Sequence, residues 1–160
     1  MTTVLVDTDT FEMWTDSLME FGGTPSRVDK LCWVHTGHQG GPLSLVAGAG
    51  VYEDLRLLLH WIQERRDLSA RPTFNEDFQA LELRDDGTLW AYESKCVPIP
   101  LLYGRYHAIG SGRCYVLGAL AMQASCEEAM RVACALDLGT GFPLAHASLH
   151  NLEHVIFVEK

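Results

Sequence analysis

Segments with strand patterning and segments with helix patterning do not alternate along this chain. They come in runs, as four strands, a helix, three strands, two helices and two strands. A doubly wound parallel sheet needs strand–helix alternation, so this order argues against one and favours antiparallel sheets with helices outside them. The expected fold class is therefore α+β. The expected strands cover residues 2–7, 11–16, 28–35, 43–47, 78–84, 88–92, 106–109, 142–149 and 154–159.

Local signals place the three helices. Apolar residues recur at helical spacing over 51–62, which predicts the first helix. Small residues predict a second helix over about 113–123. Ser125 and Glu128 have the spacing of a capping box, so we expect the third helix to begin at Ser125. It ends near Asp137.

Glycine and proline mark the connections between these elements. The tripeptide Asp85-Asp86-Gly87 separates two strand-like runs, which is a hairpin signal. We expect a loop over 22–26 and a glycine-rich turn over 36–42. The segment 96–103 contains two prolines, which cannot donate to a ladder, so we expect it to be irregular.

Length and charge limit the classes of function. The chain has 160 residues, which fits one domain over residues 1–160 with a buried core. Its formal net charge is −9, and its longest basic cluster, Arg65-Arg66, is followed by Asp67. Phosphate binding needs clustered lysine and arginine, so we expect no nucleic-acid partner.

Hydropathy and cysteine content indicate the compartment. The first residues lack a basic region followed by an apolar one, and no apolar run approaches the roughly 18 residues that span a bilayer. The five cysteines are odd in number and include no C-x-x-C pair. We therefore expect reduced, mostly buried thiols in a cytoplasmic protein that does not contact a membrane.

The N-terminus carries the first chemical signal. The chain begins Met1-Thr2-Thr3, and removal of Met1 would leave Thr2 with a free α-amino group. Such a threonine holds a nucleophile and a base in one residue, because its amine can take the proton of its hydroxyl. An α-amino group titrates at about 7.7–8.0, which suits a general base at neutral pH.

Two further patterns each allow a simpler interpretation. Gly110-Ser111-Gly112 is a strand-to-helix turn or part of a site; a dinucleotide loop would need glycine at Tyr115, so that alternative fails. His146, His150 and His154 would align on a helix as metal ligands, but they fall on an expected hairpin, where they separate. We therefore expect no metal and no organic cofactor.

Two longer stretches carry a resemblance to a known family. One runs over 108–119 and contains Gly110-Ser111-Gly112; the other runs over 125–141 and ends in Asp-Leu-Gly-Thr-Gly. Together with Thr2-Thr3, Thr15-Asp16-Ser17 and the glycines of 47–50, they resemble the proteasome β-subunit and HslV family of N-terminal-nucleophile (Ntn) hydrolases. The similarity is strongest to small bacterial and phage-borne members, including the betaproteobacterial proteasome homologue.

The resemblance implies a four-layer αββα sandwich and a set of site residues. Its implied catalytic residues are Thr2, Asp16, Lys30, Ser111, Asp137 and Thr140. The backbone N–H of Gly48 would face the developing oxyanion. Met19, Val28 and Val46 would line the pocket for the residue before the cut, which implies a hydrophobic preference.

General chemistry is consistent with these roles. A cation near an amine disfavours its protonation, so Lys30 could keep the Thr2 amine ready as a base. A buried lysine needs a partner such as Asp16 to stay charged. Asp137 is open to a plainer interpretation as a helix-terminal residue followed by a left-handed cap at Gly139, although a carboxylate there opposes the helix dipole.

The sequence thus predicts a threonine-type peptidase that acts through an acyl-enzyme. The resemblance implies homo-oligomeric rings, peptide or unfolded-protein substrates, and an ATPase unfoldase as a further partner to consider. A closed symmetric oligomer would shield a nonselective nucleophile. Two alternatives stay open: a non-proteolytic Ntn amidase, and a structural or assembly protein that has lost catalysis.

Overall fold

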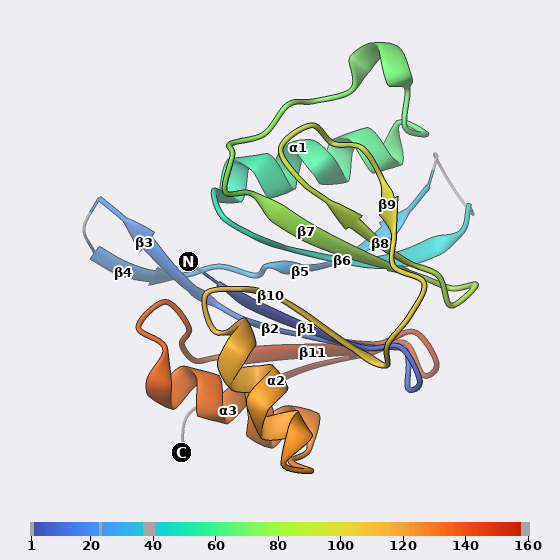
Figure 1. The fold of residues 1–160 in the computed structure, drawn as a ribbon. Helices are drawn as coiled ribbons and strands as arrows, with labels where there is room; N and C mark the ends of the chain where they lie inside the picture. The colour runs from blue at the N-terminus through green and yellow to red at the C-terminus, as the bar shows by residue number, and fades with distance from the viewer. Residues whose placement is uncertain (1, 23, 37–40, 158–160) are drawn as a thin grey trace.

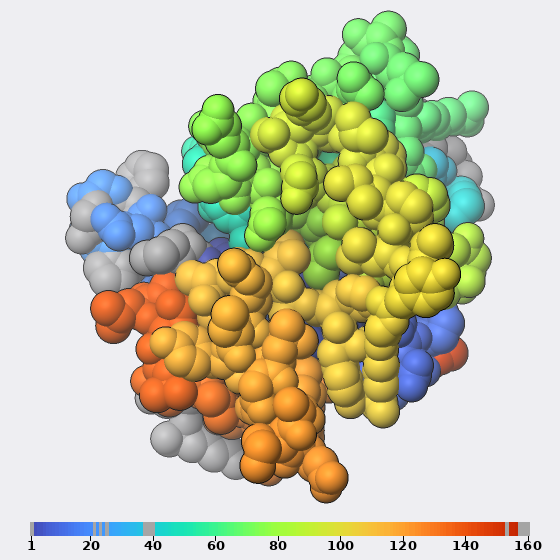
Figure 2. Space-filling model, viewed as in Figure 1, coloured from blue at the N-terminus to red at the C-terminus, as the bar shows by residue number. Residues whose placement is uncertain are grey.

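Two five-stranded antiparallel sheets lie face to face between helices in this computed structural model (Figure 1). The structure describes residues 2–22, 24–36 and 41–157. The layers run α1, second sheet, first sheet, and α2 with α3, which is the expected four-layer α+β sandwich. In the same view, the chain from α2 to α3 (orange) covers the lower face of the molecule (Figure 2).

The first sheet contains the N-terminal strand, which is paired on both sides. Its spatial order is β10-β1-β2-β11-β12, all antiparallel. Strand β1, the second in this order, places Thr3 opposite Gly110 of β10 and Val4 opposite Thr15 of β2. The strands are β1 (Thr3–Asp7), β2 (Glu12–Asp16), β10 (Tyr106–Gly110), β11 (Leu144–Ser148) and β12 (Glu153–Phe157).

The second sheet follows chain order from β5 to β9. Asp85, Asp86 and Gly87 connect β7 to β8 as the hairpin signal predicted, and Gly87 takes a positive φ of 82°. The strands are β5 (Leu31–His35), β6 (Leu43–Ala49), β7 (Gln79–Arg84), β8 (Leu89–Tyr92) and β9 (Ile99–Pro100).

Period-two alternation distributes the strand side chains among three cores. On β1, Val4 and Val6 face the space between the sheets, whereas Leu5 faces α2 and α3. On β6, Leu45 joins the core between the sheets, and Val46 joins the core beneath α1. Because both faces of these strands are covered, they read as continuous apolar runs.

The three helices form where the sequence places them. They are α1 (Tyr52–Gln63), α2 (Arg113–Ala121) and α3 (Cys126–Leu136). The capping box is present: the Ser125 hydroxyl accepts from the N–H of Glu128, and the Glu128 carboxylate accepts from the N–H of Ser125. Among the described residues, no helix combines the length and apolar character needed to cross a membrane.

The connections differ from expectation in three places. The loop expected over 22–26 contains β4 (Thr24–Arg27), which pairs with β3 (Leu18–Phe21) as a separate hairpin. The strand expected from residue 28 begins at Leu31. Within 96–103, β9 pairs with β8, because Pro100 lies on an edge strand where it need not donate. Most of the turn expected over 36–42 lies outside the described residues.

A buried carboxylate fixes the chain beyond the end of α1. Glu82 of β7 is fully buried and accepts hydrogen bonds from Arg66 at 2.5 Å and Arg84 at 3.0 Å. The hydroxyls of Ser44 and Tyr92 donate to it at 2.9 and 2.5 Å. The arginines hold the pKa of Glu82 below its ordinary value against the opposing effect of burial. This network holds α1 against the second sheet.

Two glycines give opposite expectations when replaced by alanine. Gly110 has a φ of 88°, and a Cβ there would lie 1.8 Å from the Thr2 carbonyl oxygen. Gly118 lies within α2, with open space where a Cβ would be. We expect Gly110→Ala to lower the free energy of unfolding by at least about 1–3 kcal/mol, and Gly118→Ala to raise it by about 0.4–1 kcal/mol. Urea denaturation measures both; equal effects of the two substitutions would contradict this backbone geometry.

Candidate active site

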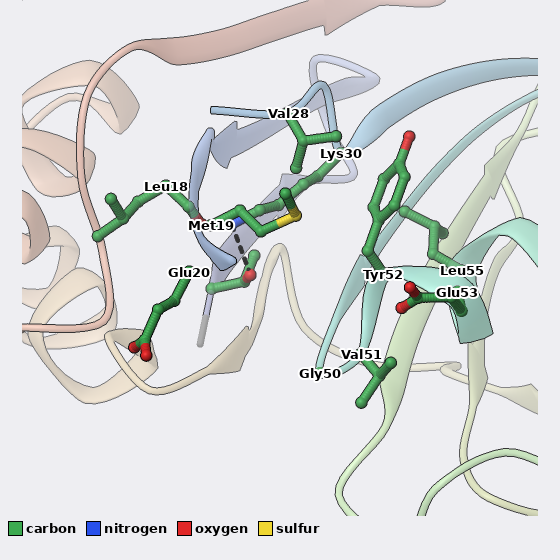
Figure 3. A pocket seen from close by; sticks show the side chains of 12 residues that line it. Leu18, Met19, Glu20, Val28, Lys30, Gly50, Val51, Tyr52, Glu53 and Leu55 are labelled. Atoms are coloured by element: carbon green, nitrogen blue, oxygen red, sulfur yellow. Dashed lines mark hydrogen bonds between the residues drawn. The ribbon is translucent and has the colours of Figure 1, made fainter. Parts of the chain in front are cut away.

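Thr2 immediately precedes β1, and its side chain meets a buried lysine. Only 2% of Thr2 is exposed. The Lys30 ammonium donates a hydrogen bond to Thr2 Oγ1 at 2.7 Å (dashed in Figure 3). Lys30 itself is 4% exposed and precedes β5. Two residues that are 28 positions apart in sequence are therefore brought into contact.

Asp16 is the partner of this lysine. The Lys30 Nζ lies 3.4 Å from Asp16 Oδ1 and 3.3 Å from Oδ2, and it also donates to the Leu18 carbonyl. Asp16 is fully buried. A buried charge without a partner is strongly unfavourable, so each member of this pair depends on the other.

The backbone completes the Asp16 site. Its Oδ1 accepts the N–H of Thr3 at 2.9 Å, and its Oδ2 accepts those of Leu18 at 3.0 Å and Gly141 at 3.3 Å. These donors come from three separate segments of the chain. One carboxylate thus holds the start of β1, the start of β3 and the chain before β11 around Lys30.

Burial disfavours the charged forms of both Lys30 and Asp16. It lowers the pKa of Lys30 from its ordinary value, although the Asp16 charge opposes this effect. It also raises the pKa of Asp16, against the Lys30 charge and the N–H donors of Thr3 and Leu18. Lys30 therefore holds its proton less tightly than a solvated lysine does, and it donates a hydrogen bond to a threonine hydroxyl.

A second hydrogen-bonded cluster lies beside the first. The Ser111 hydroxyl donates to Asp137 Oδ2 at 2.6 Å, and the Thr140 hydroxyl donates to the same oxygen at 2.5 Å. Burial alone would raise the pKa of Asp137, but these hydroxyl donors outweigh it and lower the pKa. Gly139 does not have a positive φ, so the left-handed cap of the plainer interpretation of Asp137 is not formed.

This cluster is tied to the N-terminal strand through the backbone. The N–H of Ser111 donates to the Thr2 carbonyl at 3.0 Å. Thr140 Oγ1 lies 2.5 Å from Thr3 Oγ1, which also accepts the N–H of Gly112 at 3.0 Å. A Cβ on Gly112 would lie 2.3 Å from Thr3 Oγ1, so only glycine fits between the two threonines.

Thr3 is the residue that motif reasoning missed in this region. It is fully buried, and it connects the main-chain start of β1 to both clusters. Its sequence signal is weak, since it appears only as the second half of the Thr2-Thr3 pair.

A cavity of about 260 Å³ opens beside Thr2. Met19 and Val28 line it (Figure 3). Gly48 lines it as well. Val46 does not; it is fully buried in the core beneath α1. Lining residues that the sequence did not single out come from β3 and the start of α1, among them Leu18, Glu20, Tyr52, Glu53 and Leu55.

Thr2 also borders a second cavity, of about 350 Å³. Its walls include Asp77, Gln79, Ser111 and Arg113. The threonine thus lies between an enclosure formed by β3 and α1 and a more polar one formed by the turn before α2. An extended ligand could occupy both at once.

The histidines and cysteines are dispersed. His146 on β11 stacks on Trp14 with ring centroids 4.2 Å apart, while His154 lies on β12 opposite Ala147. The residues that the structure describes include no group of three potential metal ligands. The five cysteines are free thiols, and burial raises the pKa of Cys32 to about 11.

Comparison with solved structures identifies the fold. The chain aligns over its full length with 88% of Anbu (ancestral beta-subunit) from Yersinia bercovieri, at 14% identity and a TM-score of 0.70. Ninety-nine per cent of the chain aligns with all of Thiobacillus denitrificans BPH in complex with epoxomicin, at 15% identity and a TM-score of 0.61. Ninety per cent of the chain aligns with 97% of HslV from Trypanosoma brucei, at 15% identity and a TM-score of 0.62.

These structures share the proteasome-like Ntn-hydrolase fold, and the chain has this fold too, as the sequence resemblance implied. At the level of sequence, no protein-family model and no curated protein matches the chain.

The hydrogen bonds to Asp137 should make the stability of the fold depend on pH. Because its pKa is lowered in the folded chain, ionised Asp137 stabilises the fold above the ordinary aspartate value of 3.8, and this contribution is lost as pH falls through the lowered pKa. We expect Asp137→Asn to be less stable than wild type near neutral pH, with the difference shrinking in acid. Urea denaturation between about pH 3 and about pH 7 tests this.

Ser111→Ala provides the companion measurement. It removes one donor, so the pKa of Asp137 should move back toward its ordinary value, and the acid loss of stability should be smaller and complete at a higher pH than in wild type. If the difference in the free energy of unfolding between wild type and Asp137→Asn stays constant across the pH range, the proposed contribution of these hydrogen bonds is contradicted.

Proposed function

We propose that the chain is a threonine-type Ntn peptidase. Removal of Met1 makes Thr2 the N-terminal residue, and Thr2 attacks peptide carbonyls. The observation that carries this proposal is the 2.7 Å contact between Lys30 Nζ and Thr2 Oγ1 at the edge of a cavity. An oxygen that accepts a hydrogen bond from an ammonium is stabilised as its own proton leaves. The proteasome-like fold supports the same chemistry.

The reaction proceeds in two halves. The neutral Thr2 amine takes the hydroxyl proton as Oγ1 bonds to the substrate carbonyl carbon. The Gly48 N–H stabilises the oxyanion, and the amine then gives its proton to the departing nitrogen as the C–N bond breaks. Water, deprotonated by the same amine, hydrolyses the resulting ester and regenerates Thr2.

The surrounding residues have supporting roles in this proposal. Lys30 disfavours protonation of the Thr2 amine and stabilises the developing alkoxide. Asp16 keeps Lys30 in place and compensates its charge. Ser111, Asp137 and Thr140 hold the turn before α2 against the start of β1.

Assembly into homo-oligomeric rings is part of the proposal, because the fold is that of proteasome-like proteins. A nucleophile that can cleave many peptides is confined when its sites face the inside of a closed ring. Peptides and unfolded segments would then be the substrates that can reach Thr2.

Intact mass of the purified, untagged protein before and after an epoxyketone or β-lactone probe tests the nucleophile. We expect loss of Met1 and a single probe adduct. Thr2→Ala should abolish the adduct and lower peptide hydrolysis by at least about a thousandfold, since nothing replaces the nucleophile. Thr73→Ala, at an exposed threonine away from the site, is the matched control and should behave as wild type.

Two outcomes would contradict this proposal in different ways. Retained Met1 without an adduct would favour the catalytically silent assembly protein. A Thr2 adduct with turnover of small amides but no turnover of peptides would favour the amidase.

A further inference from the structure

The cavity beside Thr2 has an apolar wall. Met19 and Val28 form one side, and Leu55 of α1 contributes to the other (Figure 3). A volume of about 260 Å³ is enough for one long side chain. An unbranched aliphatic stem would contact this wall along its length.

The charges around the cavity are unevenly distributed. Its lining contains one basic residue, Lys30, and two acidic ones, Glu20 and Glu53. Lys30 forms an ion pair with Asp16, which lies behind it, so the two glutamates remain as the uncompensated charge of the lining. In the part of the chain that the structure describes, no arginine lines this cavity.

Of these two glutamates, Glu53 is placed to meet a ligand. Figure 3 shows its carboxylate directed from α1 toward the space between α1 and β3, whereas that of Glu20 points away. Glu53 is exposed, and among the described residues no hydrogen bond or ion pair engages its carboxylate. Arg56, three residues later, lines the neighbouring groove and not this cavity.

The next residue of α1 makes a useful contrast. A carboxylate in a first helical turn is favourable because of the helix dipole, and Asp54 already occupies such a position. Asp54 is buried and accepts from the N–H and the amide of Asn75 at 3.0 and 2.7 Å. Asp54 therefore serves the fold, whereas the carboxylate of Glu53 is free to meet a substrate.

We propose that this cavity selects a lysine or arginine side chain at the residue whose carbonyl Thr2 attacks, with Glu53 as the specificity-determining residue. This inference rests on the peptidase function proposed above. The aliphatic stem packs on Met19, Val28 and Leu55, and the cationic end reaches the carboxylate of Glu53. It replaces the purely hydrophobic preference that the sequence alone implied.

The test compares three coumarylamide peptides that differ only in the residue before the fluorophore, namely arginine, leucine or glutamate. We expect kcat/KM to be highest for arginine and lowest for glutamate. The arginine-to-leucine ratio should fall about fivefold in Glu53→Gln, the upper range for a partly exposed ion pair. It should fall by at least about tenfold in Glu53→Lys, where like charges meet.

Glu76→Gln is the matched control, because it removes the same charge from an exposed glutamate outside the cavity lining and should leave the ratio unchanged. Raising the salt concentration should lower the ratio in wild type and much less in Glu53→Gln, since salt screens exposed charge pairs. A ratio that is the same in wild type and Glu53→Gln would overturn the proposal. So would faster turnover of the leucine or glutamate peptide by wild type.

A binding measurement separates this inference from the peptidase proposal. The affinities of the three corresponding acetylated peptide amides for Thr2→Ala protein, with and without Glu53→Gln, need no catalysis. Tighter binding of the arginine peptide that depends on Glu53 would support the cavity assignment even if wild type hydrolyses nothing. Equal binding of all three would overturn it even if the Thr2 nucleophile is active.

Discussion

The Asp16 carboxylate is the contact on which the candidate site depends. It accepts N–H groups from Thr3, Leu18 and Gly141, and it forms the ion pair with Lys30. A buried carboxylate so fully satisfied is much less unfavourable than an isolated one. It brings together chain segments that lie more than a hundred residues apart, and together with the Leu18 carbonyl it positions Lys30 against Thr2 Oγ1.

The position of the nucleophile follows from the placement of β1. Because β1 lies between β10 and β2, the strand that follows Thr2 is held by strands on both sides. The close approach of the chain at Gly110 and Gly112 adds the turn before α2. Sites supported by rigid elements are more accurately positioned than sites on loops. An N-terminal residue, which would ordinarily fray, is here as buried as the core.

Local patterns in the sequence predicted the elements well, and long-range geometry less well. The Ser125 capping box and the Asp85-Asp86-Gly87 hairpin are short-range signals, and both are confirmed. Val46 was misplaced because the packing beneath α1 decides whether an apolar strand residue joins a core or a cavity wall, and composition does not show that packing. Glu53 gave no signal of its own, since its relation to Thr2 exists only after α1 packs against β6.

The two cavities beside Thr2 suggest how one nucleophile could distinguish the two ends of a substrate. The enclosure between β3 and α1 has an apolar wall and uncompensated glutamates, whereas the other contains both Asp77 and Arg113. A peptide lying across Thr2 would place the residue before the cut in the first and the leaving segment in the second. The orientation of the substrate would then follow from the difference in charge between the two cavities. A cationic side chain is favoured only in the cavity whose acidic residues are not offset by a basic one.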